Sequence, residues 1–257
     1  WSALAALAAI TDRIRLGCLV TGVTYREPAV LAKMAATVDH VSDGRLEFAI
    51  GASWHEAEHR MYGIPFPPVK ERQDRLEEAM QVIRLLFDAD GRVNFDGTYY
   101  HLRDAVFVPK CVQRPHPPIM IGGGGEQRTL RAVARYGDVM NVFGTPDVVK
   151  KKIEVLERHC RDAGRDPAEI EKTVSASVVV SDNQGLIDRL AGMFGTGMGL
   201  SADEAKQVLP IGPPAHVRGV VEAYAAAGVT TIIAMTQGPW KREVYQRMND
   251  EVVAAFT

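Results

Sequence analysis

Cysteine is scarce in this chain, and its thiols lie far apart. There are 3 cysteines among 257 residues, Cys18, Cys111 and Cys160, and no CxxC pair. This spacing argues against a disulfide framework or a cysteine-rich zinc site and is typical of a reducing compartment. We therefore expect a cytoplasmic protein.

Long apolar runs and an excess of one charge are also missing. The opening WSALAALAAI spans only ten residues and has no basic flank, so it is neither a signal peptide nor a membrane span. The formal net charge is -2, which gives no general electrostatic reason to bind nucleic acid or an anionic membrane. We expect no nucleic acid and no membrane partner.

What is present is an alternation of short β-branched runs and amphipathic stretches. Because each strand is followed by a helix, the pattern predicts a parallel sheet, either closed as a barrel or open and doubly wound, and spacing leaves both open. Strands are predicted at 13–22, 45–52, 117–123, 138–144, 173–181 and 229–235, and helices at 28–42, 70–87, 126–137, 146–164 and 217–228, with a last helix that follows the strand at 229–235 and runs to Thr257.

Two segments depart from this alternation. Residues 92–108 carry an Asp96-Gly97 turn between aromatic or β-branched arms, which predicts a β-hairpin. Residues 192–201, rich in glycine and methionine, are predicted to form a loop in which Met193 and Met198 fill packing space.

Four glycines, Gly122 to Gly125, follow the strand at 117–123 and precede a helix. Such a turn lets backbone approach a ligand, and the N–H groups that open the helix favour an anion, so we predict phosphate binding with Arg128 adding a charge. The alternative to phosphate binding is a flexible turn that only leads into the helix. A dinucleotide fingerprint fits poorly because Gln127 replaces the third glycine, and no Gly-Lys-Ser/Thr follows.

The segment His55-Glu56-Ala57-Glu58-His59 matches the H-E-x-x-H zinc pattern. It lies between a strand exit and the breaker-rich segment 63–68, which leaves room for two helical turns at most. We predict a short polar helix at the mouth of a pocket and no metal site. Elsewhere, Ser175 and Ser177 lack a Gly-x-Ser-x-Gly elbow, and Asp39-His40 is predicted to be a surface pair rather than a catalytic dyad.

Three segments carry a family resemblance: RIRLGCLVTGVTYREPAVLAKMAATVDHVSDGRLEFAIGASW, EHRMYGIPFPPVKERQDRLEEAMQVIRLL and KCVQRPHPPIMIGGGG. In this order they resemble the bacterial luciferase-like monooxygenase superfamily, and within it the actinobacterial deazaflavin (coenzyme F-420) dependent oxidoreductases. The resemblance implies one (β/α)8 TIM-barrel domain over 1–257 with a hairpin insertion near 92–108, a cofactor at the carboxyl ends of the strands, and a homodimer. It also implies two further β-α elements before Trp1, so this sequence is expected to lack the first two elements of the barrel.

The resemblance assigns cofactor contacts strand by strand. It places Leu19, Val20 and Thr21 against the face of the deazaflavin ring, with a non-prolyl cis bond between Leu19 and Val20. It places Gly51, Ala52 and Ser53 at the next strand exit, in contact with the cofactor. Gly123, Gly124 and Gly125 match the phosphate-binding loop, and Asn141 matches the pocket wall.

The resemblance therefore implies an oxidoreductase that moves a hydride between C5 of the deazaflavin and a small organic substrate. An FMN-dependent monooxygenase of the same fold is the alternative, and from other classes a noncatalytic incomplete barrel or a zinc hydrolase built on His55 and His59. The catalytic acid or base stays unassigned, with His55 as a substitute candidate.

Overall fold

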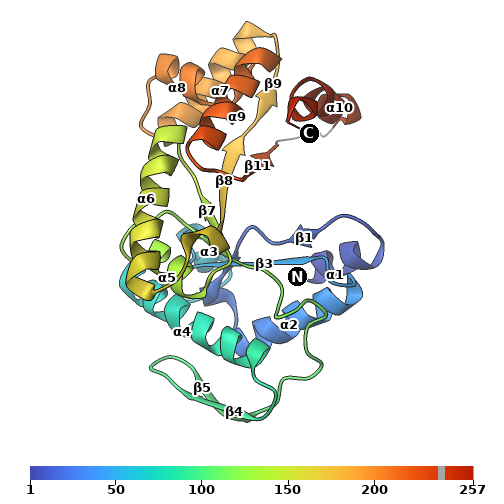
Figure 1. Ribbon diagram of the computed structural model, residues 1–257, viewed down its shortest axis with the longest axis vertical. Coiled ribbons are helices and arrows are strands. Elements are labelled where there is room, and N and C mark those ends of the chain that lie inside the picture. The colour runs from blue at the N-terminus through green and yellow to red at the C-terminus, as the bar shows by residue number, and fades with distance from the viewer. Residues whose placement is uncertain (237–240, 257) are drawn as a thin grey trace. The chain divides into compact units, whose positions relative to one another are not determined.

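The computed structural model describes residues 1–236 and 241–256, which form two compact units (Figure 1). The first unit comprises Trp1–Met140 and His159–Ile170, and the second comprises Asn141–Arg158 and Glu171–Thr257. Both alternate helices with parallel strands, as the sequence predicted. The organisation of 1–257 as one domain stays a prediction.

Strand β3 is the centre of the first unit's sheet. It pairs in parallel with three strands, with Leu46 opposite Leu16, Ile50 opposite Thr21 and Phe48 opposite Ile119. The elements of this unit are α1 (Ser2–Ala9), β1 (Leu16–Gly17), β2 (Thr21–Gly22), the 3-10 turn η1 (Val23–Tyr25), α2 (Pro28–Val41), β3 (Leu46–Gly51), α3 (Glu56–Met61), α4 (Val69–Asp88), β4 (Val93–Asp96), β5 (His101–Ala105), β6 (Ile119–Gly122), α5 (Thr129–Tyr136) and η2 (Pro167–Glu169).

Helices α2 and α4 pack against each other, and α2 also packs on β3 (Figure 1). On α4 the predicted apolar stripe is buried, with Leu76, Met80 and Ile83 fully inaccessible and Phe87 4% exposed. Helix α2 begins at Pro28, where the missing N–H costs no helical hydrogen bond. These contacts make the first unit's core from the periodicity visible in the sequence.

The predicted hairpin is confirmed as the antiparallel pair β4 and β5. Its connection is longer than the Asp96-Gly97 turn suggested, because Asp96 pairs with His101 across four intervening residues. The Glu78 carboxylate on α4 accepts hydrogen bonds from the backbone N–H groups of Thr98, Tyr99 and Tyr100. A helical side chain thereby holds the tip of the hairpin.

The chain passes into the second unit within β7 (Val139–Val142). There β11 pairs in parallel with β8, with Ile232 opposite Val174, and β10 pairs in parallel with β9. The remaining elements are α6 (Pro146–Ala163), β8 (Glu171–Ser177), β9 (Val179–Val180), α7 (Gln184–Gly197), α8 (Ala202–Val208), β10 (Ile211–Gly212), α9 (Pro214–Ala226), β11 (Thr231–Met235), α10 (Arg242–Glu251) and η3 (Val253–Ala255). The last predicted helix ends earlier than expected, and Thr257 lies outside the described residues.

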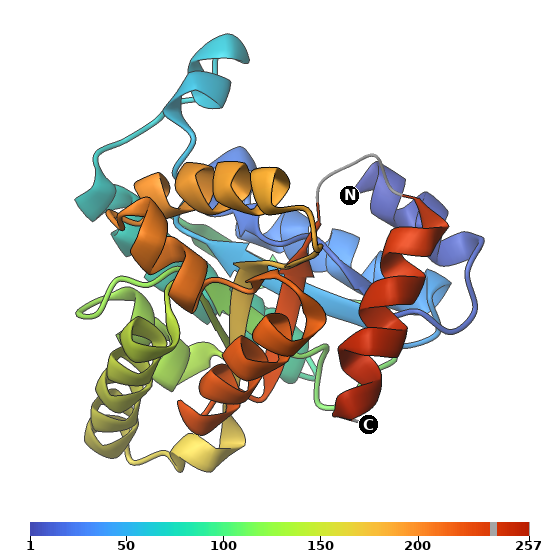
Figure 2. The same cartoon turned by 90° about the horizontal axis from the view of Figure 1, so that it is seen from above.

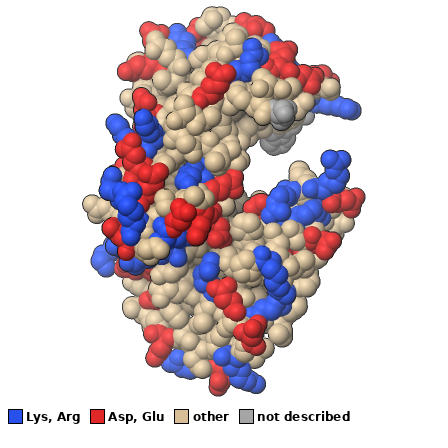
Figure 3. Space-filling view, in the orientation of Figure 1, with Lys and Arg blue, Asp and Glu red and all other residues tan. Residues whose placement is uncertain are grey.

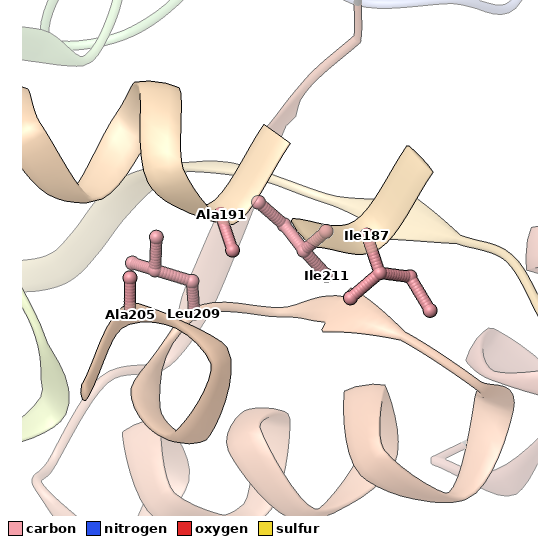
Figure 4. Close-up of a cluster of buried hydrophobic side chains, with 5 residues drawn as sticks. All are labelled: Ile187, Ala191, Ala205, Leu209 and Ile211. Atoms are coloured by element: carbon pink, nitrogen blue, oxygen red, sulfur yellow. The ribbon is translucent and has the colours of Figure 1, made fainter. Parts of the chain in front are cut away.

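The loop predicted at 192–201 is wrong for residues 192–197, because α7 continues through Gly197 and packs beside α8 (Figure 2), and residues 198–201 form the connection between them. Ala191 on α7 is fully buried in a cluster with Ala205 and Leu209 from the α8 segment, together with Ile187 and Ile211 (Figure 4). A Cβ at Gly195 would lie 2.6 Å from the Ala205 Cβ, so glycine serves close helix packing here. Met193 and Met198 are 51% and 40% exposed and do not fill packing space.

Acidic and basic side chains are interspersed on the face seen in Figure 3. This mixture agrees with the near-balanced composition. Among the described residues, no helix is both long enough and apolar enough to cross a membrane.

Candidate functional site

A pocket of about 400 Å³ opens in the first unit where β3 and β6 end. That volume suits a small organic ligand. It brings together residues predicted from three separate strand exits: Leu19, Val20, Gly51, Ala52, Ser53, Gly123, Gly124 and Gly125. The carboxyl ends of parallel strands thus converge on one cavity, as is usual for ligand sites of α/β proteins.

The Val20 side chain occupies space that two glycines leave free. A Cβ at Gly51 would lie 2.9 Å from Val20 Cγ2, and a Cβ at Gly122 would lie 2.8 Å from Val20 Cγ1. The Leu19–Val20 peptide bond is cis, as the resemblance implied. Larger residues at Gly51 or Gly122 would therefore displace Val20 from the pocket wall.

Ser53 lies on the pocket wall in a left-handed backbone conformation with φ +66°. This conformation is unfavourable for a residue other than glycine, and it persists only where the surrounding structure holds it. The Ser53 Oγ lies 2.7 Å from Thr24 Oγ1. A Cβ at Gly22 would lie 2.4 Å from that Ser53 Oγ, so the glycine makes room for the hydroxyl.

The two histidines of the zinc pattern have different environments. His55 is the N-cap of α3, is exposed, and stacks on Trp54 with 4.9 Å between ring centroids. His59 is fully buried; its Nε2 lies 2.6 Å from Thr24 Oγ1 and its Nδ1 lies 2.8 Å from the His55 carbonyl oxygen. Within residues 1–236 and 241–256, no three His, Cys, Asp or Glu side chains come together as a metal site.

Tyr25 lines the pocket beside His59 and Glu58. Its hydroxyl donates to Glu58 Oε2, and its ring lies 4.6 Å from the His59 ring. Burial, reinforced by the hydrogen bond and charge of Glu58, raises the pKa of Tyr25 to about 12. The phenol therefore stays protonated at neutral pH and acts as a hydrogen-bond donor.

Three predicted residues do not line this pocket. Thr21 is buried and accepts a 3.1 Å hydrogen bond from Trp1 Nε1. The Arg128 guanidinium pairs with Asp74 at 2.7 Å and with Glu77 at 3.3 Å. Arg128 is also the N-cap of α5, so the helix begins later than the sequence suggested.

Asn141 belongs to the second unit and is 3% exposed. Its amide donates to Thr173 Oγ1 at 2.9 Å and accepts from Ser175 Oγ at 3.1 Å. Both polar ends of the side chain are thus bonded inside the core. Its assignment to the pocket wall stays a prediction.

Sequence reasoning missed Gln73, which comes from α4 and lines the pocket. Its Nε2 donates to Thr129 Oγ1 at 3.3 Å, while its Oε1 is buried without a hydrogen-bond partner among the described residues. A buried acceptor without a partner is costly unless a ligand or water satisfies it. A polar residue three positions before the buried Leu76 on an otherwise regular amphipathic helix was the available signal.

The family model of luciferase-like monooxygenases matches residues 1–207. An uncharacterised protein of Mycobacterium tuberculosis (strain H37Rv) is 30% identical over 166 residues, which cover 65% of this chain and 57% of the relative. A phthiodiolone/phenolphthiodiolone dimycocerosates ketoreductase of Mycobacterium sp. (strain JLS) is 34% identical over 194 residues, 73% of this chain and 50% of the relative. A pyrimidine monooxygenase of Allorhizobium ampelinum is 32% identical over 171 residues, 63% of this chain and 45% of the relative. The chain thus spans about half the length of these relatives.

Solved structures share the fold at low identity. A coenzyme F-420-dependent secondary alcohol dehydrogenase, solved with a cofactor–acetone adduct, superposes with a TM-score of 0.85 and 22% identity over 99% of this chain and 83% of its own. A coenzyme F-420-dependent tetrahydromethanopterin reductase of Methanopyrus kandleri superposes with a TM-score of 0.83 and 21% identity, over 100% of this chain and 87% of its own. The α/β fold is therefore one that these enzymes also have.

Proposed function

We propose, from the premise that this chain belongs to the luciferase-like monooxygenase family, that it is an oxidoreductase transferring a hydride between coenzyme F-420 and a small organic substrate. We propose further that its parallel strands form part of the (β/α)8 barrel of that family, with a homodimeric, cytoplasmic protein as the working form. The similarity of the F-420-dependent structures supports this choice.

The observation that carries the proposal is the pocket itself. An aliphatic surface at Leu19 and Val20 suits the face of a flat ring, and Gly123 to Gly125 present backbone without side chains for a phosphate. The buried Gln73 Oε1 has an acceptor position open for a donor group. The residues present therefore fit a deazaflavin.

When bound, the deazaflavin supplies hydride chemistry at C5. The chain's own residues would hold the group: Val20 would support one ring face, Gly123 to Gly125 would hold the phosphate end, and Ser53 would meet the ring edge or the substrate. Holding reactants in one geometry and excluding water are the contributions that a protein makes to such cofactor chemistry.

An FMN-dependent monooxygenase is the second candidate. The similarity to the pyrimidine monooxygenase supports it. The same ring surface and phosphate loop would serve FMN, because the two cofactors share a tricyclic ring and a phosphate-bearing side chain. The choice between them depends on which cofactor the pocket prefers.

A fluorescence titration of the full chain with coenzyme F-420 and, separately, with FMN tests the proposal. We expect saturable binding with preference for coenzyme F-420. Gly122→Ala should weaken it at least tenfold, since the new Cβ would lie 2.8 Å from Val20. Gly91→Ala is the matched control, because no heavy atom lies within 4 Å of its Cβ position.

The other outcomes point elsewhere. Preference for FMN would favour the monooxygenase. Binding of neither cofactor would overturn the proposal in favour of a noncatalytic chain. Stoichiometric zinc in the purified protein would revive the hydrolase built on His55 and His59.

A further inference from the structure

His59 is a buried titratable group that the proposed function does not use. It is fully inaccessible, and its ring lies between those of Tyr25 and Phe66, at 4.6 and 4.7 Å. Thr24 connects the ring to the pocket wall: its Oγ1 lies 2.6 Å from Nε2 and 2.7 Å from the Ser53 Oγ, while the Tyr25 hydroxyl lies 3.5 Å from Nδ1. Among the described residues, this is a continuous chain of hydrogen bonds from a pocket wall to a buried imidazole.

The direction of each hydrogen bond follows from one fixed acceptor. A carbonyl oxygen can only accept, so the 2.8 Å contact with the His55 carbonyl places a proton on His59 Nδ1. In the neutral imidazole Nε2 is then an acceptor. Thr24 donates to it, and Ser53 donates to Thr24, which leaves Ser53 Oγ as an acceptor toward the pocket.

The protonated imidazole reverses the chain. His59 Nε2–H then donates to Thr24, Thr24 donates to Ser53, and the Ser53 hydroxyl donates into the pocket. The two protonation states therefore present opposite hydrogen-bonding character at the same pocket atom. A histidine coupled in this way can pass a proton to or from that pocket atom.

We propose that Ser53, Thr24 and His59 form a proton relay between a group bound in the pocket and the buried His59 imidazole. The catalytic meaning of the relay rests on the proposed function. When a substrate alcohol is oxidised, its O–H bond breaks and the proton passes to Ser53, the Ser53 proton to Thr24, and the Thr24 proton to His59 Nε2. The alcohol carbon loses its hydride to the cofactor, and the oxygen electron pair completes the carbonyl; reduction runs in reverse.

The surroundings of His59 are consistent with a movable proton. From η1, Thr24 contacts Nε2, and Tyr25, which donates to Glu58, has its hydroxyl 3.5 Å from Nδ1. The carbonyl of His55, the N-cap of α3, bonds Nδ1, and from α4 the Arg72 guanidinium lies over the Phe66 ring, 3.9 Å from its centroid. His59 acts through Thr24 and Ser53, so it is a positioning residue for the proton.

Hydrogen exchange of the imidazolium Nε2 proton tests the relay without cofactor or substrate. In the ¹⁵N-histidine-labelled full chain, we expect the neutral His59 to carry its proton on Nδ1. At acid pH, Thr24→Val should slow Nε2–H exchange at least tenfold, because the near-isosteric valine interrupts the route. Thr24→Ser should restore it, and Thr37→Val, an exposed threonine on α2 bonded to the Lys33 carbonyl, is the control.

Each contrary result has a defined meaning. A neutral proton on Nε2, or equal exchange rates in the wild-type chain and Thr24→Val, would overturn the relay. The titration with coenzyme F-420 keeps the two proposals apart, since Thr24→Val should change cofactor affinity less than threefold. A wild-type chain that binds no cofactor but shows Thr24-dependent exchange would overturn the proposed function while the relay stands.

Discussion

The backbone N–H of Val112 donates a 2.7 Å hydrogen bond to the Asp39 carboxylate. Asp39 also accepts from the backbone and side-chain nitrogens of Gln113, at 3.0 and 2.7 Å, and is fully buried. The predicted surface pair Asp39-His40 is therefore wrong for Asp39. Its carboxylate fastens the segment after the hairpin to the end of α2.

Asp39→Ala should lower the free energy of unfolding by about 3 kcal/mol, because it leaves the N–H donors of Val112 and Gln113 without their charged acceptor. Urea unfolding followed by circular dichroism would measure the loss. The exposed Asp12→Ala should stay within about 0.5 kcal/mol of the parent chain. Equal stability of the two variants would contradict the role assigned to Asp39.

Alanine substitutions at two glycines of α7 should change the stability of the protein in opposite directions. Gly195→Ala should destabilise by about 1–3 kcal/mol, since its Cβ would lie 2.6 Å from Ala205 Cβ. Gly192→Ala, with no heavy atom within 4 Å, should stabilise by about 0.5–1 kcal/mol through helix propensity. Thermal unfolding of the two variants beside the parent decides; stabilisation by both would mean that α7 and α8 do not pack closely.

Tyr224 should make the second unit sensitive to alkali. Burial raises the pKa of Tyr224 to about 12, and its hydroxyl donates to the Gly144 carbonyl at 2.7 Å. In the unfolded chain the pKa of a tyrosine is about 10, so between about pH 10 and 12 the folded state keeps a proton that the unfolded state has lost. The free energy of unfolding therefore falls as the pH rises from about 10 to 12.

Tyr224→Phe removes the contribution of Tyr224 to that dependence, while Tyr25 and Cys111, whose pKa values are also raised by burial, keep theirs. It should cost about 1 kcal/mol at pH 7, from the lost hydrogen bond, and should flatten the decline of the unfolding free energy between about pH 10 and 12. Denaturant unfolding at a series of pH values measures both effects. A variant whose alkaline decline matches that of the parent would count against the assignment.

Thiol labelling should distinguish the three cysteines. Cys18 is partly exposed, whereas Cys111 and Cys160 are buried. Burial, with a contribution from the Asp39 charge, raises the pKa of Cys111 to about 12, so that thiol stays protonated at pH 8. Mass spectrometry after brief iodoacetamide treatment should show a single adduct at Cys18, with Cys111 and Cys160 modified only after denaturation; early modification of Cys111 would refute this.

Local signals in the sequence determined most of the elements and the glycine loop of the pocket. The apolar stripe of Leu76, Met80 and Ile83 predicted α4, because a 3.6-residue period must place those side chains on one buried face. The glycine run from Gly122 to Gly125 indicated a ligand loop by itself, whereas Gly51 and its neighbours were assigned to the cofactor site by the family resemblance. The apolar stripe and the glycine run depend only on residues that are neighbours in the sequence, so the sequence alone could predict them.

Contacts between distant segments were decided only in the tertiary structure. Arg128 follows the glycine loop, yet its charge pairs with Asp74 from α4, and the H-E-x-x-H pattern divides into an exposed His55 and a buried His59 bonded to Thr24. Gln73 enters the pocket because α4 packs against α5, which begins at Thr129. Sequence periodicity fixes which face of an element is buried, but a polar side chain's partner depends on which elements meet, and that is set by packing of the whole unit.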